Sequence, residues 1–329
     1  MFQKHLRNGA VALCLVVWSS QALAQDDRQT SPAYPTRTIS IITPSAGGGA
    51  DAAARIIGAA LAQSMKASVI IDPRPGAGGN VASEFVARSF PDGHTLLLAL
   101  NSMLSVNPAL YSSIRFDPIG DFQPIGILGT TPYVLAAYPS VPVNSVSELI
   151  ALANARPGSL TYSSSGHGSP SHLSAILFSL ATGAQLQHVP YRTASGATTD
   201  LLSGQVQLMF GSLYSLLPFI QAKKIKALGV TGPSRSAFAP EIPAIAETVP
   251  SFEFLPWYGL LAPAQTPTSI VQRLAKATSA VLATQDIREK LREQGVDVAF
   301  QDGPALTERT RRELETWKAI IESAGNRIE

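Results

Sequence analysis

The sequence predicts a two-domain α/β protein in which mostly parallel sheets carry helices on their faces. Short β-branched runs alternate with helical patterns almost throughout the chain, which favours parallel sheets flanked by helices. A chain of 329 residues suggests two domains, because a single hydrophobic core stops growing at roughly 250–300 residues. Two strand-like segments rich in glycine and proline, 124–138 and 252–262, are the expected crossovers between the domains.

The first 24 residues are interpreted as a cleavable signal peptide. Lys4 and Arg7 precede an apolar stretch at 9–18, and the Ala-Leu-Ala at 22–24 is a small-x-small cleavage site. The apolar stretch is too short to span a bilayer, which disfavours the alternative of a membrane anchor. We therefore expect export to the periplasm.

Cleavage after Ala24 would leave a formally neutral chain without cysteine. The segment holds two of the 25 basic residues and no acidic one, so 23 basic residues would face 23 acidic ones. A formally neutral chain has no net electrostatic field that would attract nucleic acid or a membrane surface. The single cysteine, Cys14, would also leave, so the exported protein is expected to rest on its hydrophobic core.

The strands are expected where short β-branched runs are bounded by turn residues. In chain order they are Thr38–Thr43, Ser68–Asp72, Thr95–Ala99, Tyr133–Ala137, Leu160–Ser163, Leu186–Val189, Val206–Phe210, Ala227–Val230 and Tyr258–Ala262.

The helices are expected where apolar residues recur with helical spacing after a capping residue or a glycine turn. In chain order they are Ala50–Met65, Gly79–Ser89, Ser145–Ala155, Ser169–Thr182, Ala194–Leu202, Ser215–Ala222, Ser269–Thr284, Asp286–Gln294 and Thr307–Ala324.

The turn after the first expected strand is glycine-rich and leads directly into a helix. Free N–H groups and a partial positive charge at a helix start bind anions, and glycine lets the backbone approach them. Residues 47–52 satisfy G-x-G-x-x-A, and Asp72 lies at about the ribose-binding distance, so a dinucleotide is one possible ligand. A small carboxylate is the other. The residues 44–46 before the first glycine and Asp51 inside the turn favour the carboxylate.

Three further helix starts have the same character. Ser165 or Ser169 can cap the helix after the strand at 160, with Pro170 in its first turn. Thr193 or Ser195 precedes another helix, and Asn80 stands near the start of a third. Helix starts that favour anions thus occur in both halves of the chain. They indicate a cleft in which backbone amides and hydroxyls bind an acid with two acidic groups.

At these residues the chain resembles the Bug family of periplasmic solute-binding proteins, the TctC-like receptors of tripartite tricarboxylate transporters. The resemblance covers nearly the whole exported chain and implies a two-domain Venus-flytrap fold for small carboxylates. The residues that carry it are YPTRTISIITPSAGGGADAAAR (34–55), DPRPGAGGNVASEFVARSFPDGHTLL (72–97), NPALY (107–111), YSSSGHGSPSHL (162–173), HVPYR (188–192), TDLLSGQVQLMF (199–210) and GLLAPAQTP (259–267).

The resemblance also implies where the ligand lies. A carboxylate is expected against the first glycine turn and its helix, often through ordered waters, with the second domain closing over it. We expect domain 1 over 25–128 and 256–329, and domain 2 over 129–255. The candidate ligand-binding residues are Ser45, Ala46, Gly47, Gly48, Gly49, Asp51, Asn80, Ser102, Ser165, His167, Gly168, Ser169, Tyr191, Arg192, Thr193 and Asp200.

The sequence departs from the family pattern around the expected pocket. Ser45-Ala46 replace bulkier residues, His167 stands where asparagine is common, and residues 193–196 replace Gly-Ser-Ala-Pro. These departures leave the identity of the ligand open.

Several candidates also have a purely structural interpretation. Asp51 is a cap or a ligand contact, Ser165 and Ser169 are caps, and Arg192 pairs with a local acid such as Asp200. Packing is the expected role of His172, His188, Trp257 and Tyr258.

Catalysis is not expected. The sequence holds no G-x-S-x-G, H-E-x-x-H, C-x-x-C or G-x-x-x-x-G-K motif, and Ser165 and His167 in one loop are poorly placed as nucleophile and base. The histidines have no metal-ligand spacing with an acid, so neither a metal nor a cofactor is expected. The expected partner of this monomer is a set of membrane transporter subunits or, alternatively, a sensor kinase.

Overall fold

The computed structural model describes residues 34–46 and 49–324, and the described residues from Arg37 onward group as one compact unit. The predicted signal peptide and its cleavage site lie outside the described residues. In the described part no helix is long and apolar enough to cross a membrane.

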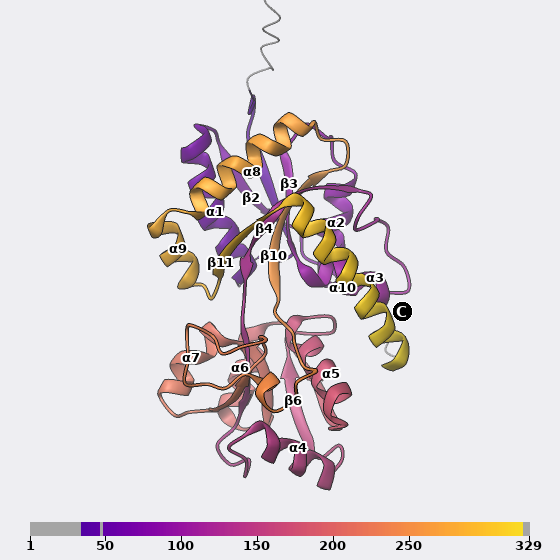
Figure 1. The fold of residues 1–329 in the computed structure, drawn as a ribbon, viewed down its shortest axis with the longest axis vertical. Coiled ribbons are helices and arrows are strands. Elements are labelled where there is room, and N and C mark those ends of the chain that lie inside the picture. Colours follow the sequence, from indigo (N-terminus) through magenta and orange to yellow (C-terminus); the bar gives the residue numbers. More distant parts are fainter. Residues whose placement is uncertain (1–33, 47–48, 325–329) are drawn as a thin grey trace, which may run out of the picture. The chain divides into compact units, whose positions relative to one another are not determined.

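Six described strands form the first sheet, in the order β11-β4-β10-β3-β1-β2 (Figure 1). The central strands are buried at nearly every position, as in β10, so both of their faces are covered. The bounds are β1 Ile39–Thr43, β2 Val69–Pro73, β3 Thr95–Leu100, β4 Phe122–Thr130, β10 Trp257–Pro263 and β11 Asp297–Asp302.

Five described strands form the second sheet, in the order β7-β6-β8-β5-β9. Because β4 leads into β5 and β9 leads back into β10, the chain passes twice between the two sheets, as predicted. The domain boundaries at 128/129 and 255/256 stay a prediction. The strand bounds are β5 Tyr133–Ala137, β6 Leu160–Ser164, β7 Leu186–Pro190, β8 Leu208–Ser212 and β9 Lys226–Val230.

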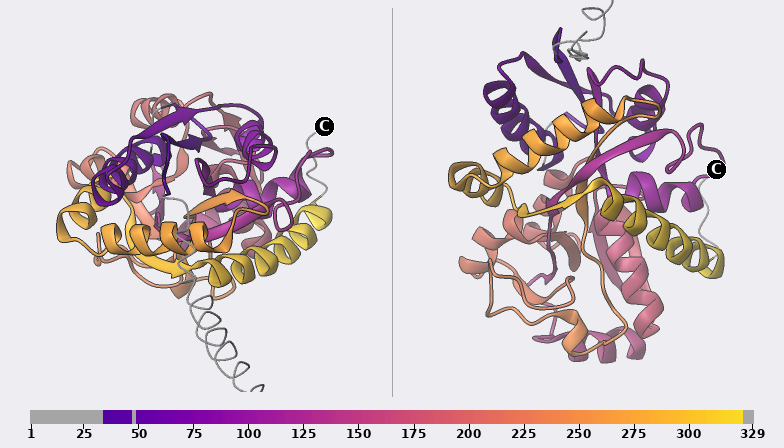
Figure 2. Two further views of the ribbon diagram at one scale, coloured as in Figure 1. Left: turned by 90° about the horizontal axis from the view of Figure 1, so that it is seen from above. Right: turned by 45° about the horizontal axis from the view of Figure 1, so that its top comes forward.

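Helices flank both sheets. In the first, α8 packs beside α1 and α9, while α10 runs along β4 and against α3 (Figures 1 and 2). The bounds in this part are α1 Gly49–Met65, α2 Asn80–Ala87, α3 Asn107–Leu110, α8 Thr268–Leu282, α9 Gln285–Arg292 and α10 Gly303–Ala324, with short turns η1 Ala77–Gly79 and η2 Ser102–Val106. In the second they are α4 Val146–Ala155, α5 Pro170–Thr182, α6 Ala194–Ser203, α7 Leu213–Gln221 and the turn η3 Ile245–Glu247.

The expectation of mostly parallel sheets is wrong, because both sheets are mixed. The parallel pairs are β1/β2, β1/β3, β6/β7 and β6/β8, and each arises from strands joined through helices. The strands that the chain enters from the other sheet run the opposite way. The antiparallel pairs are β10/β3, β10/β4, β11/β4, β5/β8 and β5/β9.

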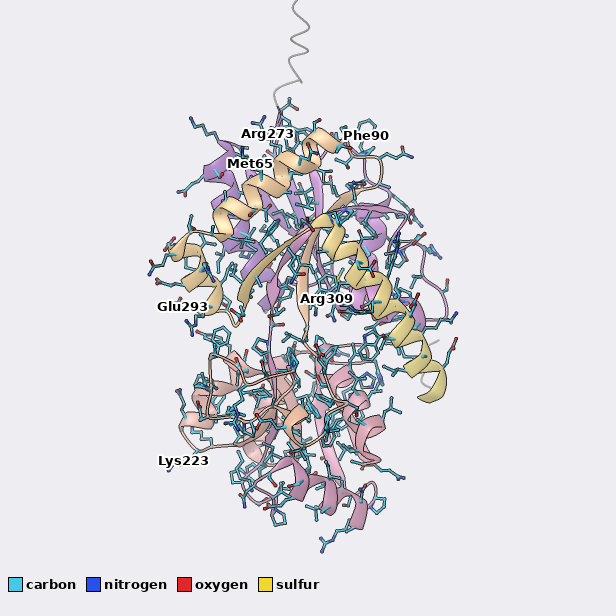
Figure 3. The ribbon with its side chains drawn as sticks, in the orientation of Figure 1. Met65, Phe90, Lys223, Arg273, Glu293 and Arg309 are labelled. Atoms are coloured by element: carbon cyan, nitrogen blue, oxygen red, sulfur yellow. The ribbon has the colours of Figure 1, made fainter. Side chains whose placement is uncertain are left out.

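A buried polar network ties α10 to the return strand β10. Glu313 on α10 accepts hydrogen bonds from the Trp257 indole N–H at 2.8 Å and from Arg309 Nε at 2.9 Å, and its other oxygen accepts one from Ser105 Oγ at 2.9 Å. Arg309 lies beside β10, and its guanidinium stands 5.6 Å from the centre of the Trp257 ring (Figure 3). The network thus joins three segments that are distant in the sequence.

Candidate functional site

The carboxyl ends of the parallel strands bring the candidate residues to one edge of each sheet. Since β1, β2 and β3 are parallel, the turns that follow them lie at the same edge of the first sheet. Those turns carry the candidates from Ser45 to Asp51, Asn80 and Ser102. In the same way β6 and β7 deliver 165–169 and 191–193 to one edge of the second sheet.

The first glycine turn leads into α1, which begins at Gly49. Gly47 and Gly48 lie outside the described residues. Asp51 is only 6% exposed and forms a two-bond ion pair with Arg55, at 2.9 and 3.2 Å. This pairing within the helix balances the charge of Asp51, so the carboxylate does not leave a net negative charge at the helix start.

Asn80 is buried and paired with a residue that the sequence analysis did not single out. The side-chain amide of Asn107 donates to Asn80 Oδ1 at 2.6 Å and to the carbonyl of Gly78 at 3.1 Å. Asn107 Oδ1 is buried and has no hydrogen-bond partner among the described residues, so it is an acceptor available to a donor group of a ligand. Ser102 is also buried, in the π-helical turn η2.

One predicted cap is confirmed at each of two helix starts of the second sheet, whereas Ser165, the alternative to Ser169, does not cap α5. Ser169 accepts the N–H of His172 at the start of α5, and Thr193 accepts the N–H of Gly196 at the start of α6. Asp200 accepts a 2.5 Å hydrogen bond from the Tyr191 hydroxyl. Burial, together with Asp200, raises the pKa of that hydroxyl to about 12, so it remains a neutral donor.

Residues of the two edges touch in the described structure. A Cβ added at Gly168 would lie 3.1 Å from Leu110 Cδ2 and 3.7 Å from Asn107 Oδ1. The turn after β6 therefore packs directly against α3.

The hydroxyl of Tyr258 adjoins the start of α1. A Cβ at Gly49 would lie 3.0 Å from Tyr258 Oη, so this hydroxyl stands beside the helix start. Burial raises the pKa of Tyr258, and it raises that of Tyr133 to about 12. Both side chains are therefore neutral hydrogen-bond donors at neutral pH.

Two cavities among the described residues are bordered by candidate residues. A cavity of about 620 Å³ is bordered by Gly49 and Ala52 of α1 and by Tyr214, Ser215 and Pro218 of α7. A second, of about 610 Å³, is bordered by His167 together with Leu110, His172 and His188. Gly49 thus borders the first cavity, and His167 borders the second.

Comparison with known proteins decides the family. The model of the TctC family, described as "Tripartite tricarboxylate transporter family receptor", matches residues 53–326. The chain belongs to this receptor family.

Two relatives of the receptor match over almost their whole length. A UPF0065 protein from the tcbD–tcbE intergenic region of Pseudomonas sp. strain P51 is 35% identical over 314 residues, which cover 94% of this chain and 91% of the relative. Protein BugT of Bordetella pertussis is 32% identical over 302 residues, 90% of this chain and 91% of BugT.

Solved structures of the family share the fold. Rpa4515 of R. palustris, solved with adipate, is 34% identical with a TM-score of 0.81, covering 89% of this chain and 98% of the other. MatC of Rhodopseudomonas palustris, solved with bound malate, is 29% identical with a TM-score of 0.78, covering 88% and 100%. The periplasmic binding protein BugD has a TM-score of 0.80 at 29% identity, covering 90% and 100%. This TctC receptor therefore has the two-domain fold of periplasmic binding proteins.

The receptor also brings together three histidines. His172 and His188 stack with their ring centres 4.3 Å apart, and Tyr162 stacks on the other side of His188 at 4.9 Å. His167 stands edge-on to both, at 5.1 and 4.9 Å. Burial, with smaller contributions from the neighbouring histidines, lowers the pKa of His172 to about 3 and that of His188 to about 4.

We expect His172 to make the receptor less stable as the pH falls. The pKa of His172 in the folded protein is below its unfolded value of about 6.5. Between these two pKa values the ring therefore binds a proton in the unfolded chain but not in the folded one. The stability from the neutral ring is complete above about pH 6.5 and is lost as the pH falls toward about 3, at about 1.4 kcal/mol per pH unit. Urea unfolding between about pH 7 and about pH 5 should show a shallower loss for His172→Gln than for the wild type.

The difference in slope between the two proteins removes the contribution of the titrating groups that do not interact with His172. Gln187→Ala is the matched control, because Gln187 is exposed and precedes His188 in the same strand. It should keep the slope of the wild type. Equal slopes for His172→Gln and the wild type would mean that His172 is not held neutral.

Proposed function

We propose that this receptor works outside the cytoplasm, binds a small organic carboxylate at the start of α1, and delivers it to the membrane subunits of a tripartite tricarboxylate-type transporter. The observation that carries the proposal is the cavity of about 620 Å³ between α1 and α7. It adjoins the first N–H groups of a 17-residue helix, and the neutral Tyr258 hydroxyl stands beside them. An acid there would receive hydrogen bonds from backbone and hydroxyl donors.

The family supports a carboxylate as the ligand class. Two relatives were solved with adipate and malate, both dicarboxylates. The second carboxyl group of such an acid would find the helix starts that Ser169 and Thr193 cap on the other sheet. We propose Ser45, Ala46, Gly49, Asn80, Ser102, Ser165, Gly168 and Tyr191 as further contacts, and His167, Arg192 and Asp200 as residues that border the approach.

The proposed location is the periplasm, after removal of residues 1–24. It is supported by the family, whose solved members include periplasmic binding proteins. We propose that the receptor is a monomer, that it binds its acid without chemical change, and that it needs no cofactor for this.

A thermal-shift screen tests the proposal. Adipate, malate, citrate, glutamate and benzoate are added to the purified protein. At about 100 times Kd a ligand stabilises the folded state by about 2.7 kcal/mol, which raises Tm by roughly 5 °C. At least one acid should do so, and NMR of that acid should show that none is consumed.

NAD and FMN serve as comparison ligands and should leave Tm unchanged. A shift with either of them, and with none of the acids, would support the dinucleotide alternative and contradict the carboxylate. Consumption of the acid would contradict the proposal of simple binding.

A further inference from the structure

Three histidines from separate segments converge beside β7. His167 lies in the turn after β6, His172 in the first turn of α5, and His188 within β7. One ring nitrogen of each lies within 4.8 Å of those of the other two. We propose that these imidazoles form a binding site for a divalent transition-metal ion of the Zn²⁺, Ni²⁺ or Cu²⁺ class.

The donor set selects the class of metal. Imidazole nitrogen suits Zn²⁺, Ni²⁺ and Cu²⁺, whereas Mg²⁺ and Ca²⁺ require oxygen ligands. His172 and His188 are held neutral by burial, and the neutral ring is the form that offers a lone pair to a metal.

His188 is oriented as a metal ligand would be. Its Nε2 lies 2.6 Å from Ser164 Oγ, which also lies 3.2 Å from the carbonyl of Gly166 as a donor. With the serine proton on Gly166 O, His188 Nε2–H donates to Ser164 and Nδ1 carries the free lone pair. Metal-ligating histidines almost always donate their other ring N–H in this way, which fixes the tautomer and the ring direction.

His172 links the site to the turn that carries His167. Its Nδ1 accepts the backbone N–H of Gly168 at 3.2 Å. Coordination through Nδ1 would replace this hydrogen bond, and coordination through Nε2 would place the ring proton on Nδ1 against the same N–H. In both cases the hydrogen bond between the Gly168 N–H and His172 Nδ1 breaks, so the turn must shift when the ion binds.

His167 is the ligand able to make that adjustment. Zn–N bonds of about 2.0–2.1 Å place two nitrogens of a tetrahedral site about 3.3 Å apart, so the present separations must shorten. The His167 side chain is exposed, and the neighbouring glycines have φ of +107° at Gly166 and +72° at Gly168. The rings of His172 and His188 have less freedom, because they stack on each other and Tyr162 stacks on His188.

The cavity leaves room for further ligands of the ion. All three rings border the space of about 610 Å³, whose remaining lining includes Leu110 and Ile176. Three neutral imidazoles leave the full charge of a divalent ion unbalanced. A water, a hydroxide or a carboxylate entering from the cavity would complete the coordination.

Titration of the full chain, prepared without a polyhistidine tag, tests the site. Calorimetry with ZnCl₂ should give one ion per chain, and Co²⁺ should produce the visible absorption of a nitrogen-ligated site. His167→Ala should weaken Zn²⁺ binding by about 10- to 100-fold or more, since even outer-shell changes cost that much. This variant changes an exposed side chain in a turn, so the fold should survive.

Gln187→Ala is the matched control and should bind Zn²⁺ as the wild type does. His188→Gln should lose the site as His167→Ala does, with circular dichroism confirming that it is folded; if it is not, His167→Ala alone decides. The proposal is overturned if the wild type binds neither Zn²⁺ nor Co²⁺, or if His167→Ala and Gln187→Ala bind Zn²⁺ equally well. No organic acid is used, so the outcome is independent of the carboxylate proposed above.

Discussion

Gly49→Asp is expected to abolish or strongly weaken carboxylate binding without lowering the stability of the ligand-free protein. An aspartate in the first turn of α1 interacts favourably with the helix dipole, so the fold should be maintained. The new carboxylate would occupy the helix start that we propose for the acid. Charged hydrogen bonds lost there are worth roughly 1.5–3 kcal/mol each, which corresponds to about 10- to 100-fold in Kd.

Gly49→Asn is the matched control. Both variants add a Cβ, which would lie 3.0 Å from Tyr258 Oη, and both have similar side-chain volume. Any steric cost is therefore shared, and the difference in Kd between the two reports the charge. Calorimetry with the acid that gives the largest thermal shift measures it. Equal affinities would mean that the acid binds elsewhere, and the turn at 165–169 would be the next place to test.

The βα units of this chain could be predicted because their signals are local. The run before Pro44 and the alanine-rich stretch after it are β1 and α1 within one residue of the predicted bounds. The edge strand β11, Asp297–Asp302, was missed. Its pattern is mostly exposed, and its Asp and Gln residues lack the apolar run by which a buried strand is predicted.

The strand directions could not be predicted from alternation alone. A helix between two strands indicates a parallel pair, but β5 and β10 are reached from the other sheet without such a helix. The start of β8 also differs from the prediction, since this strand was expected from Val206 and begins at Leu208.

The candidate site was predictable where it rests on turn chemistry. Residue type and position narrowed the caps to Ser165 or Ser169 and to Thr193 or Ser195, and the structure has Ser169 and Thr193. Asn107 and Tyr258 were not assigned to the site, because their nearness to Asn80 and Gly49 comes from packing between distant segments. The histidine cluster was not predicted for the same reason, since its successive members stand five and sixteen residues apart in the sequence.

Glu313→Ala is expected to lower the stability more than any surface change on α10. The side chain of Glu313 is 19% exposed, and its carboxylate accepts hydrogen bonds from Trp257 and Arg309. The Trp257 side chain is fully buried. Removing the Glu313 carboxylate leaves the indole N–H without this acceptor at a cost of about 1–3 kcal/mol, and it leaves a largely buried guanidinium without its carboxylate. Together these predict a loss of about 2–5 kcal/mol and a fall in Tm of about 4–12 °C.

Glu315→Ala on the same helix is the control, because Glu315 is exposed and its loss should change the stability by less than about 0.5 kcal/mol. Glu313→Gln separates the two contributions. It keeps an oxygen for the Trp257 N–H, but it removes the charge beside Arg309 and replaces the oxygen that accepts from Ser105 with an NH₂ group, so it should fall between the wild type and Glu313→Ala. Urea unfolding of the four proteins measures this order. If Glu313→Ala were as stable as Glu315→Ala, the network between α10 and β10 would contribute nothing to the fold, and the packing of Trp257 alone would hold the return strand.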